Sequence, residues 1–151
     1  MKNNINWNFD NTYSKLPEPF REKINPVKVK NPQLILLNES LAKDLNLDFS
    51  EISQSELSVL FTGNKLPKNS NSIAQAYAGH QFGHFTMLGD GRAVLIGEHI
   101  SKNNHRYDIQ FKGSGKTAFS RNGDGRAVLI GEHLSQNKER YDIQFKGSGK
   151  T

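Results

Sequence analysis

The sequence predicts an α+β fold in which an antiparallel sheet is accompanied by short helices. The sheet is indicated by the apolar run Ala93 to Ile96 and by the alternating segment 107–112, which has the period of a half-buried strand. The helices are indicated by capping signals in front of apolar stripes. Residues 92–98 and 106–112 are therefore expected to pair as antiparallel strands.

The first 33 residues are expected to form an irregular arm. Prolines at positions 17, 19, 26 and 32 interrupt any helix that could form there. Four aromatic residues lie among these prolines, and we expect their rings to pack on the rest of the domain. They are Trp7, Phe9, Tyr13 and Phe20.

Two short helices carry clear capping signals. Asn38 is a good N-cap for a helix over residues 39–45. Ser53 and Glu56 have the spacing of a capping box, and the helix that they begin should end at Gly63.

Weaker patterns predict a strand and a helix, and a pair of histidines raises the question of a metal site. Leu34 to Leu37 is a candidate for a short apolar strand, and Ser72 is expected to cap a small helix over 73–78. His80 and His84 would share a face of a helix and suggest a metal site. Flanking glycines and the lack of an H-E-x-x-H pattern favour polar turn residues instead.

The segment 89–117 occurs a second time as 123–151, a partial repeat. At an offset of 34 residues, 25 of the 29 aligned positions are identical. Two similar β units compete for one place in the core, so the second copy is expected to be less well ordered or to dock as an extra hairpin at a sheet edge. The four differing pairs are Ile100/Leu134, Lys102/Gln136, Asn104/Lys138 and His105/Glu139.

The glycine turn before the apolar run suggests a phosphate site. Gly89 and Gly91 allow the backbone to approach an anion, and Arg92 can neutralise its charge. Alternation places Lys112 on the face opposite the apolar side chains, toward this turn. The alternative is an ordinary hairpin turn with solvated charges, because such turns are common. A P-loop is excluded, since Gln110 stands where that pattern requires glycine.

Composition narrows the class of protein. The length of 151 residues fits one domain, and the net charge of +5 favours an anionic partner, whether nucleotide, nucleic acid or acidic protein. Without cysteine there is no disulfide framework and no thiolate metal site. The longest apolar runs are too short for a membrane span and the start is polar, so a cytoplasmic protein is the simplest interpretation.

Five segments, taken together and in this order, resemble the N-terminal part of the selenoprotein O family, kinase-like proteins described as protein adenylyltransferases. By this resemblance, residues 1–129 are the N-terminal portion of a kinase-fold domain. The segments are WNFDNTY (7–13), LP (16–17), AYAGHQFGHF (76–85), LGDGRAVLIGE (88–98) and YDIQFKGSGKTAFSRNGDGRAVL (107–129).

The resemblance implies a protein-kinase-like (pseudokinase) fold that binds ATP in an inverted orientation. It also implies transfer of AMP to Ser, Thr or Tyr hydroxyls of protein substrates, with Mg²⁺ or Mn²⁺ as the metal. Carried over by motif, the family's nucleotide-binding positions are Gly89, Gly91, Arg92, Lys112, Asp124 and Gly125.

After Leu129 the sequence departs from the family's pattern. The family continues to two further nucleotide-binding arginines, a catalytic aspartate and an Asn/Asp metal pair, whereas this sequence returns to the hairpin. The resemblance therefore implies no catalytic and no metal-binding residue here, and a chain that is incomplete and inactive alone. The alternative is a non-catalytic remnant that binds phosphates or nucleic acid. Nucleic acid is disfavoured, because alternation assigns Tyr107 and Phe111 to the core face.

Overall fold

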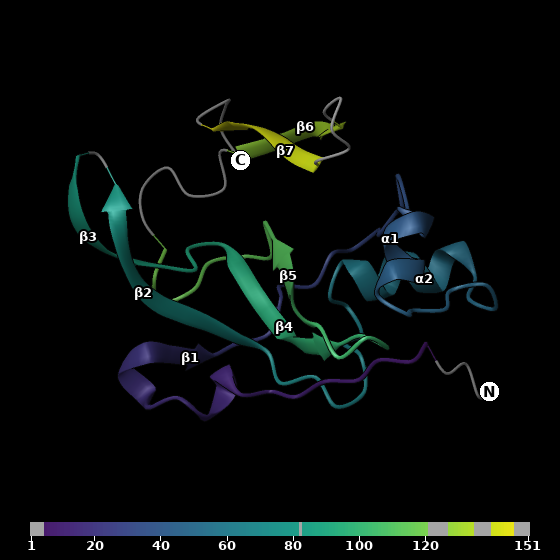
Figure 1. Cartoon of the computed structure of the whole chain (residues 1–151), viewed down its shortest axis with the longest axis horizontal. Helices are drawn as coiled ribbons and strands as arrows, with labels where there is room; N and C mark the ends of the chain where they lie inside the picture. The colour runs from purple at the N-terminus through teal and green to yellow at the C-terminus, as the bar shows by residue number, and fades with distance from the viewer. Residues whose placement is uncertain (1–4, 82, 121–126, 135–139, 147–151) are drawn as a thin grey trace.

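The main sheet of the protein is antiparallel. The computed structural model of the chain describes residues 5–81, 83–120, 127–134 and 140–146. The strand order is β1-β2-β4-β5, and β3 pairs with β2 off this path (Figure 1). This arrangement, with few short helices, confirms the predicted α+β class. The strands are β1 (Arg21–Lys23), β2 (Ile73–Gln81), β3 (His84–Gly89), β4 (Ala93–Ile100) and β5 (Arg106–Lys112).

The β4–β5 hairpin has the predicted pairing. Its register runs from Ala93 opposite Lys112 to Ile100 opposite Arg106, with a bulge between Leu95 and Gly97. Side chains of β4 form the centre of the core, since Val94, Leu95 and Ile96 are at most 1% exposed. Along the second half of β5, half-buried and exposed residues alternate as expected for a strand with one face on the core. Tyr107, which alternation assigned to the core face, is instead 38% exposed.

The helix predicted over 73–78 is wrong, because this segment is the first part of β2. Alanines at positions 74, 76 and 78 favour a helix in isolation. Two pairings override that preference: β3 lines β2 from Ala76 to Gln81, and Ile73 lies opposite Leu95 of β4. Ile73 and Ala74 are at most 1% exposed, so burial between neighbouring strands decides the structure here.

The strand predicted at Leu34 to Leu37 is also wrong. The segment has no regular secondary structure, and Ile35 and Leu36 are 90% and 82% exposed. A strand is stabilised by pairing with a neighbour, and a short apolar run does not specify one.

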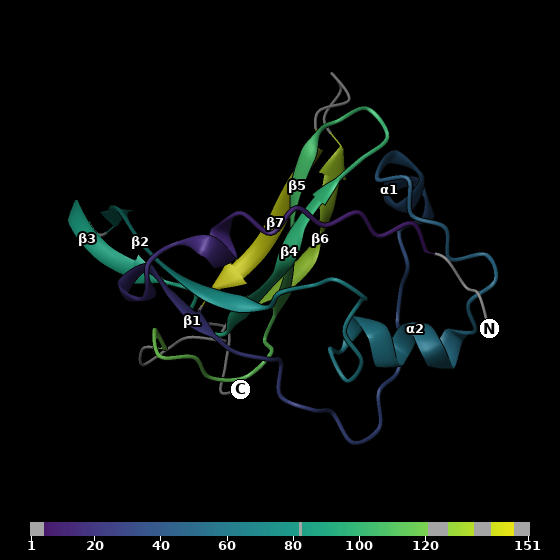
Figure 2. The same cartoon turned by 90° about the horizontal axis from the view of Figure 1, so that it is seen from below.

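Both helices with clear caps form as predicted. Helix α1 (Glu39–Asp44) begins after Asn38, whose side chain accepts the Leu41 N–H at 3.0 Å. Helix α2 (Gln54–Phe61) has the reciprocal capping box of Ser53 and Glu56. It ends before Gly63, which has the positive φ of 77° that favours glycine. In Figures 1 and 2 both helices lie to one side of the β4–β5 hairpin, and the β2–β3 hairpin projects on the other.

Residues 5–16, here called the arm, run beside the end of β4. The backbone of Asp10 donates to the Glu98 carbonyl at 2.9 Å, and Ile100 donates to the Asn8 carbonyl at 2.8 Å. The arm contains one of two short 3₁₀ turns, Tyr13–Lys15 and Glu18–Phe20. Packing of the N-terminal aromatics is confirmed for Trp7, which stacks on Phe9 with ring centroids 5.2 Å apart.

Packing of the arm against β4 requires a glycine at position 97. A Cβ there would lie 2.6 Å from the Phe9 ring and 2.6 Å from Asn11 Oδ1. The neighbouring Glu98 is 1% exposed, and its carboxylate accepts the Tyr13 N–H at 2.8 Å, the Thr12 hydroxyl, and Arg106 at 3.0 Å. The arm is therefore fixed by shape and by a buried charge together.

The second copy forms a separate hairpin of β6 (Ala127–Leu134) and β7 (Arg140–Lys146). Its register reproduces that of β4 and β5, including the bulge, which lies between Leu129 and Gly131. Docking at an edge of the main sheet is not found among the described strands, since β6 pairs with β7 in a sheet of their own (Figure 1).

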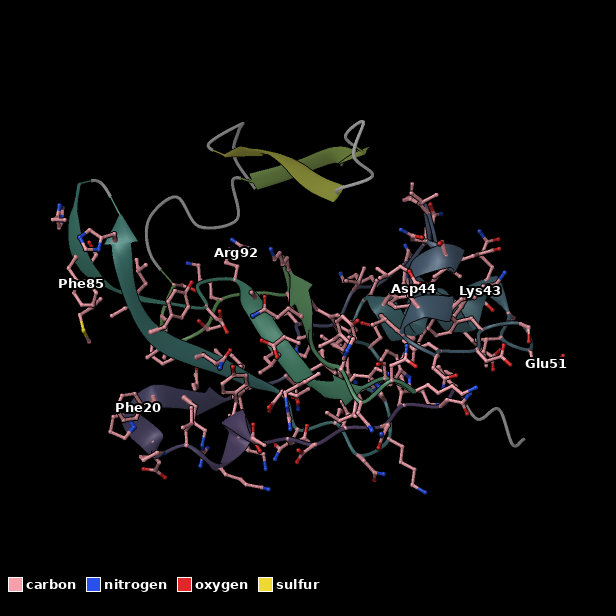
Figure 3. All side chains as sticks on the ribbon, viewed as in Figure 1. Phe20, Lys43, Asp44, Glu51, Phe85 and Arg92 are labelled. Carbon is pink, nitrogen blue, oxygen red and sulfur yellow. The ribbon has the colours of Figure 1, made fainter. Side chains whose placement is uncertain are left out.

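Replacing Phe9 by alanine tests whether the arm stabilises the fold. We expect Phe9→Ala to lower the free energy of unfolding by about 2–3 kcal/mol, somewhat less than for a fully buried phenylalanine. Phe20→Ala is the control, because Phe20 is 53% exposed at the periphery of the sheet (Figure 3) and should change little. Urea denaturation measures both variants, and equal small losses would contradict a stabilising arm.

Candidate functional site

The predicted glycine turn and lysine lie at the same end of the β4–β5 hairpin. Gly89 ends β3, and the turn through Arg92 leads into β4. The first residue of β4, Ala93, is opposite Lys112, the last residue of β5. Lys112 is exposed, as alternation predicted. Four of the six predicted positions, including Gly91, are thus brought together, while Asp124 and Gly125 lie outside the described residues.

Arg92 contains an unsatisfied buried donor. Its Nε atom is buried and has no hydrogen-bond partner within the described part of the chain. The residue stands at the start of β4 (Figure 3). A buried N–H without an acceptor costs free energy, and an anion oxygen is the strongest acceptor available to a guanidinium. The residues present therefore fit a phosphate group.

Asp90 is a site residue that the sequence analysis missed. It is 6% exposed, its N–H donates to the Gln75 carbonyl at 2.8 Å, and its Oδ2 accepts the Gln75 N–H at 3.1 Å. These two bonds fix the turn to β2. Aspartate between two glycines is a typical turn residue, and the repeated G-D-G-R pattern was the available signal.

The charge of Asp90 is coupled to its surroundings. Burial raises the pKa of the Asp90 carboxyl, and the nearby Asp108 raises it further, against the hydrogen bond from Gln75 and the positive charge of Lys112. Lys112 therefore acts electrostatically on the turn even though it enters from β5. A bound anion would compete with Asp90 for that positive charge.

The loop after β5 holds the turn from its other side. Thr117 Oγ1 donates to the Asp90 carbonyl at 2.5 Å, and the Thr117 N–H donates to the Gly91 carbonyl at 3.2 Å. Ser114 donates its N–H to the Arg92 carbonyl at 2.9 Å. These bonds tie three consecutive carbonyls of the turn to the loop and so fix the turn's conformation. An anion would bind this turn through N–H groups and cationic side chains, since carbonyl oxygens only accept hydrogen bonds.

Packing gives Gly89 a role that the sequence analysis did not include. A Cβ at this position would lie 2.5 Å from the Phe119 Cβ and 3.0 Å from the Gln75 carbonyl oxygen. The absence of a side chain lets the loop that contains Phe119 close over the end of β3. Closure of this loop also needs Gly113 and Gly115, which have positive φ values of 77° and 106°.

No metal centre is found in the part of the chain that the structure describes. It contains no group of three or more His, Cys, Asp or Glu side chains that could hold a metal ion. His80 and His84 lie at the end of the β2–β3 hairpin, opposite Phe85 and Gln81 respectively. Both are strand residues, so neither the helix face that suggested a metal site nor the favoured assignment to polar turn residues is correct.

Among the described residues, no helix is long and apolar enough to cross a membrane.

Comparison with known proteins gives one family. The family model described as "Protein adenylyltransferase SelO" matches residues 3–134. The chain is similar to the "Protein nucleotidyltransferase YdiU" of Pelagibacter ubique, with 70% identity over 97 residues. It is 57% identical over 97 residues to the protein of that name from Nitrosococcus oceani, and 55% identical over 98 residues to that from Anoxybacillus flavithermus.

Each similarity covers only part of the relative. The matched regions are 64% or 65% of this chain, and 20% of each relative. The chain therefore spans about a fifth of the length of the curated relatives that it matches.

The raised pKa of Asp90 predicts how stability depends on pH. A carboxyl whose pKa is higher in the folded chain destabilises the fold when ionised. This destabilisation is absent below the ordinary pKa of 3.8 and grows as pH rises through the folded-state value. Asp90→Asn keeps an acceptor for the Gln75 N–H, so we expect it to raise the thermal midpoint at pH 7 by ~2–4 °C.

The same substitution in the second copy, Asp124→Asn, is the matched control and should leave the midpoint unchanged. The gain from Asp90→Asn should shrink as the pH is lowered, and melting curves between acid and neutral pH measure it. A gain that is constant over this range would show that the charge of Asp90 is not the cause.

Proposed function

Because this chain belongs to the SelO family of protein adenylyltransferases, we propose that it forms the glycine-turn and lysine part of that family's ATP site. The observation that supports this most directly is the register of β4 and β5. It sets Lys112 opposite Ala93, immediately after the turn from Gly89 to Arg92. In the proposed site, Arg92 from the turn and Lys112 from the end of β5 bind the same anion.

In this site, Arg92 and Lys112 bind phosphate oxygens and neutralise their charge. The unsatisfied Nε of Arg92 supports its role, because phosphate oxygens accept hydrogen bonds from guanidinium groups. Lys112 is a point charge on a flexible side chain, suited to a phosphate at the open end of the hairpin. Asp124 and Gly125 are proposed as further nucleotide-binding positions, from the family motif alone.

The chemistry belongs to the whole protein, of which this chain represents the N-terminal portion over residues 1–129. There, a Ser, Thr or Tyr hydroxyl oxygen of a protein substrate forms a bond to the α-phosphorus of ATP, and the bond from that phosphorus to pyrophosphate breaks. A carboxylate of the whole protein accepts the hydroxyl proton. Mg²⁺ or Mn²⁺, when bound, neutralises the triphosphate. The turn and its two cations contribute by holding the phosphates in a fixed position, which lowers the entropic part of the barrier.

ATP binding to the chain tests the assignment of Lys112. We expect Lys112→Ala to weaken binding of ATP with Mg²⁺ at least about tenfold, equivalent to ~1.4 kcal/mol for a lost charge-assisted contact. Lys146→Ala removes the same residue of the second copy and should leave affinity unchanged. Isothermal titration calorimetry measures both, together with the double variant, which removes any contribution of Lys146. Wild-type affinity in the double variant would refute the assignment.

Transfer of AMP is a separate test of the whole proposal. With ATP labelled at the α-phosphate, we expect the 151-residue chain to label no protein, because only part of the proposed site is present. A full-length relative assayed in parallel should give labelled protein that resists denaturing electrophoresis. Robust labelling by the chain alone would show that the residues described here suffice for catalysis.

A further inference from the structure

The chain contains two equivalent hairpins and one surface that holds such a hairpin. This surface, here called the socket, consists of the arm, Ile73 of β2 and the carbonyl of Leu45. In the structure it holds β4, through the backbone bonds to the arm and the pairing of Ile73 with Leu95. The second hairpin has the same backbone register and no strand partner outside itself among the described residues.

The socket recognises three consecutive residues of β4. Gly97 leaves room for Phe9 and Asn11, and Glu98 accepts hydrogen bonds from the arm. His99 is 1% exposed. Its Nδ1 accepts the Asn8 N–H at 3.2 Å, so its Nε2 carries the proton and donates to the Leu45 carbonyl at 2.7 Å. The two bonds require the His99 tautomer with its proton on Nε2, and they fix the ring between the Asn8 N–H and the Leu45 carbonyl.

The second copy repeats every residue that the socket recognises. Gly131, Glu132 and His133 follow each other in β6 at the same distance from the bulge as their counterparts in β4. Arg140 stands opposite Leu134 as Arg106 stands opposite Ile100. The three side chains of the first hairpin that bond to the arm, those of Glu98, His99 and Arg106, have identical counterparts in the second copy.

We infer that the β6–β7 hairpin can also occupy this socket and replace β4–β5 within the same chain. The connection permits the exchange, because Gly89 would be followed by Asp124 just as it is now followed by Asp90. The 34 residues between them would form a loop whose ends meet. The entropic cost of closing such a loop rises only with the logarithm of its length.

The first hairpin is the favoured occupant. Asn104, in the turn between β4 and β5, has a φ of 59°, a left-handed conformation that asparagine tolerates. The second copy has Lys138 at this position, and lysine is disfavoured there. The turn residue at this position and the entropic cost of closing the 34-residue loop both favour β4–β5 as the occupant of the socket. The β6–β7 hairpin occupies the socket when β4–β5 no longer fits.

Paired glycine substitutions test the exchange. Gly97→Val places the side chain of a good strand former against Phe9 and Asn11. Gly131→Val is the matched change in the second copy, and its side chain would meet the same two residues only when β6 occupies the socket. The full chain is compared as wild type, each single variant and the double variant. Trp7, the only tryptophan, stacks on Phe9 and lies edge-on to His99, so its fluorescence reports whether the arm is docked.

The expected result is strong non-additivity. Either single variant should keep the Trp7 emission of the wild type, because one intact hairpin still fills the socket. The double variant should show the red-shifted emission of a solvent-exposed indole, and a thermal midpoint lower by at least about 5 °C. A further variant, Gly97→Val with residues 124–151 deleted, should behave like the double variant.

Three outcomes would overturn the inference. If Gly97→Val alone releases Trp7 as fully as the double variant, the second hairpin does not enter the socket. If Gly131→Val alone releases it, the first hairpin is not the favoured occupant. If the double variant keeps the wild-type emission and midpoint, the fit at Gly97 is not what the socket recognises.

Discussion

The buried carboxylate of Glu98 is the interaction on which the position of the other elements depends. An ionised group at 1% exposure is tolerated only if hydrogen bonds and an opposite charge compensate its lost hydration. Here the bonds come from Thr12 and Tyr13 of the arm and the charge comes from Arg106 of β5. Arg106 also pairs with Asp10 at 2.7 Å, which lowers the pKa of that carboxyl. Burial of Glu98 in β4 therefore requires both the arm and β5 to be in place.

The register fixed at this end of the hairpin determines the candidate site at the other end. With Ile100 opposite Arg106, the ladder and its bulge bring Ala93 opposite Lys112. The turn beside Lys112 is held by the hydrogen bond between Asp90 and Gln75 of β2, and by Thr117 from the following loop. A cost remains, since Asp90 is an acidic group buried where an anion is proposed to bind. Lys112 offsets that charge, so its position affects both the fold and the proposed binding of phosphate.

Sequence patterns predicted the elements whose signals are local. The capping box at Ser53, the N-cap at Asn38 and the alternation that exposes Lys112 depend on near neighbours in the chain, and all three are found. The errors concern segments whose structure depends on distant partners. Ile73 is a strand residue because Leu95 lies opposite, and nothing within its own segment indicates that pairing. The role of Asp90 in fixing the turn was missed for the same reason, because its hydrogen-bond partner Gln75 lies in β2, 15 residues earlier in the chain.

The repeat shows, within one molecule, which features depend on local sequence and which depend on distant partners. Nearly identical sequences give the same hairpin with a bulge at the same place, so the strand pairing and its irregularity are local properties. The packing of β4 is not local, because it needs the arm, and the chain has one arm for two hairpins. Glu132 and His133 repeat the residues Glu98 and His99, and the burial of the first pair depends on arm residues that lie outside the repeat. A sequence motif therefore specifies a site only together with the segment that completes it.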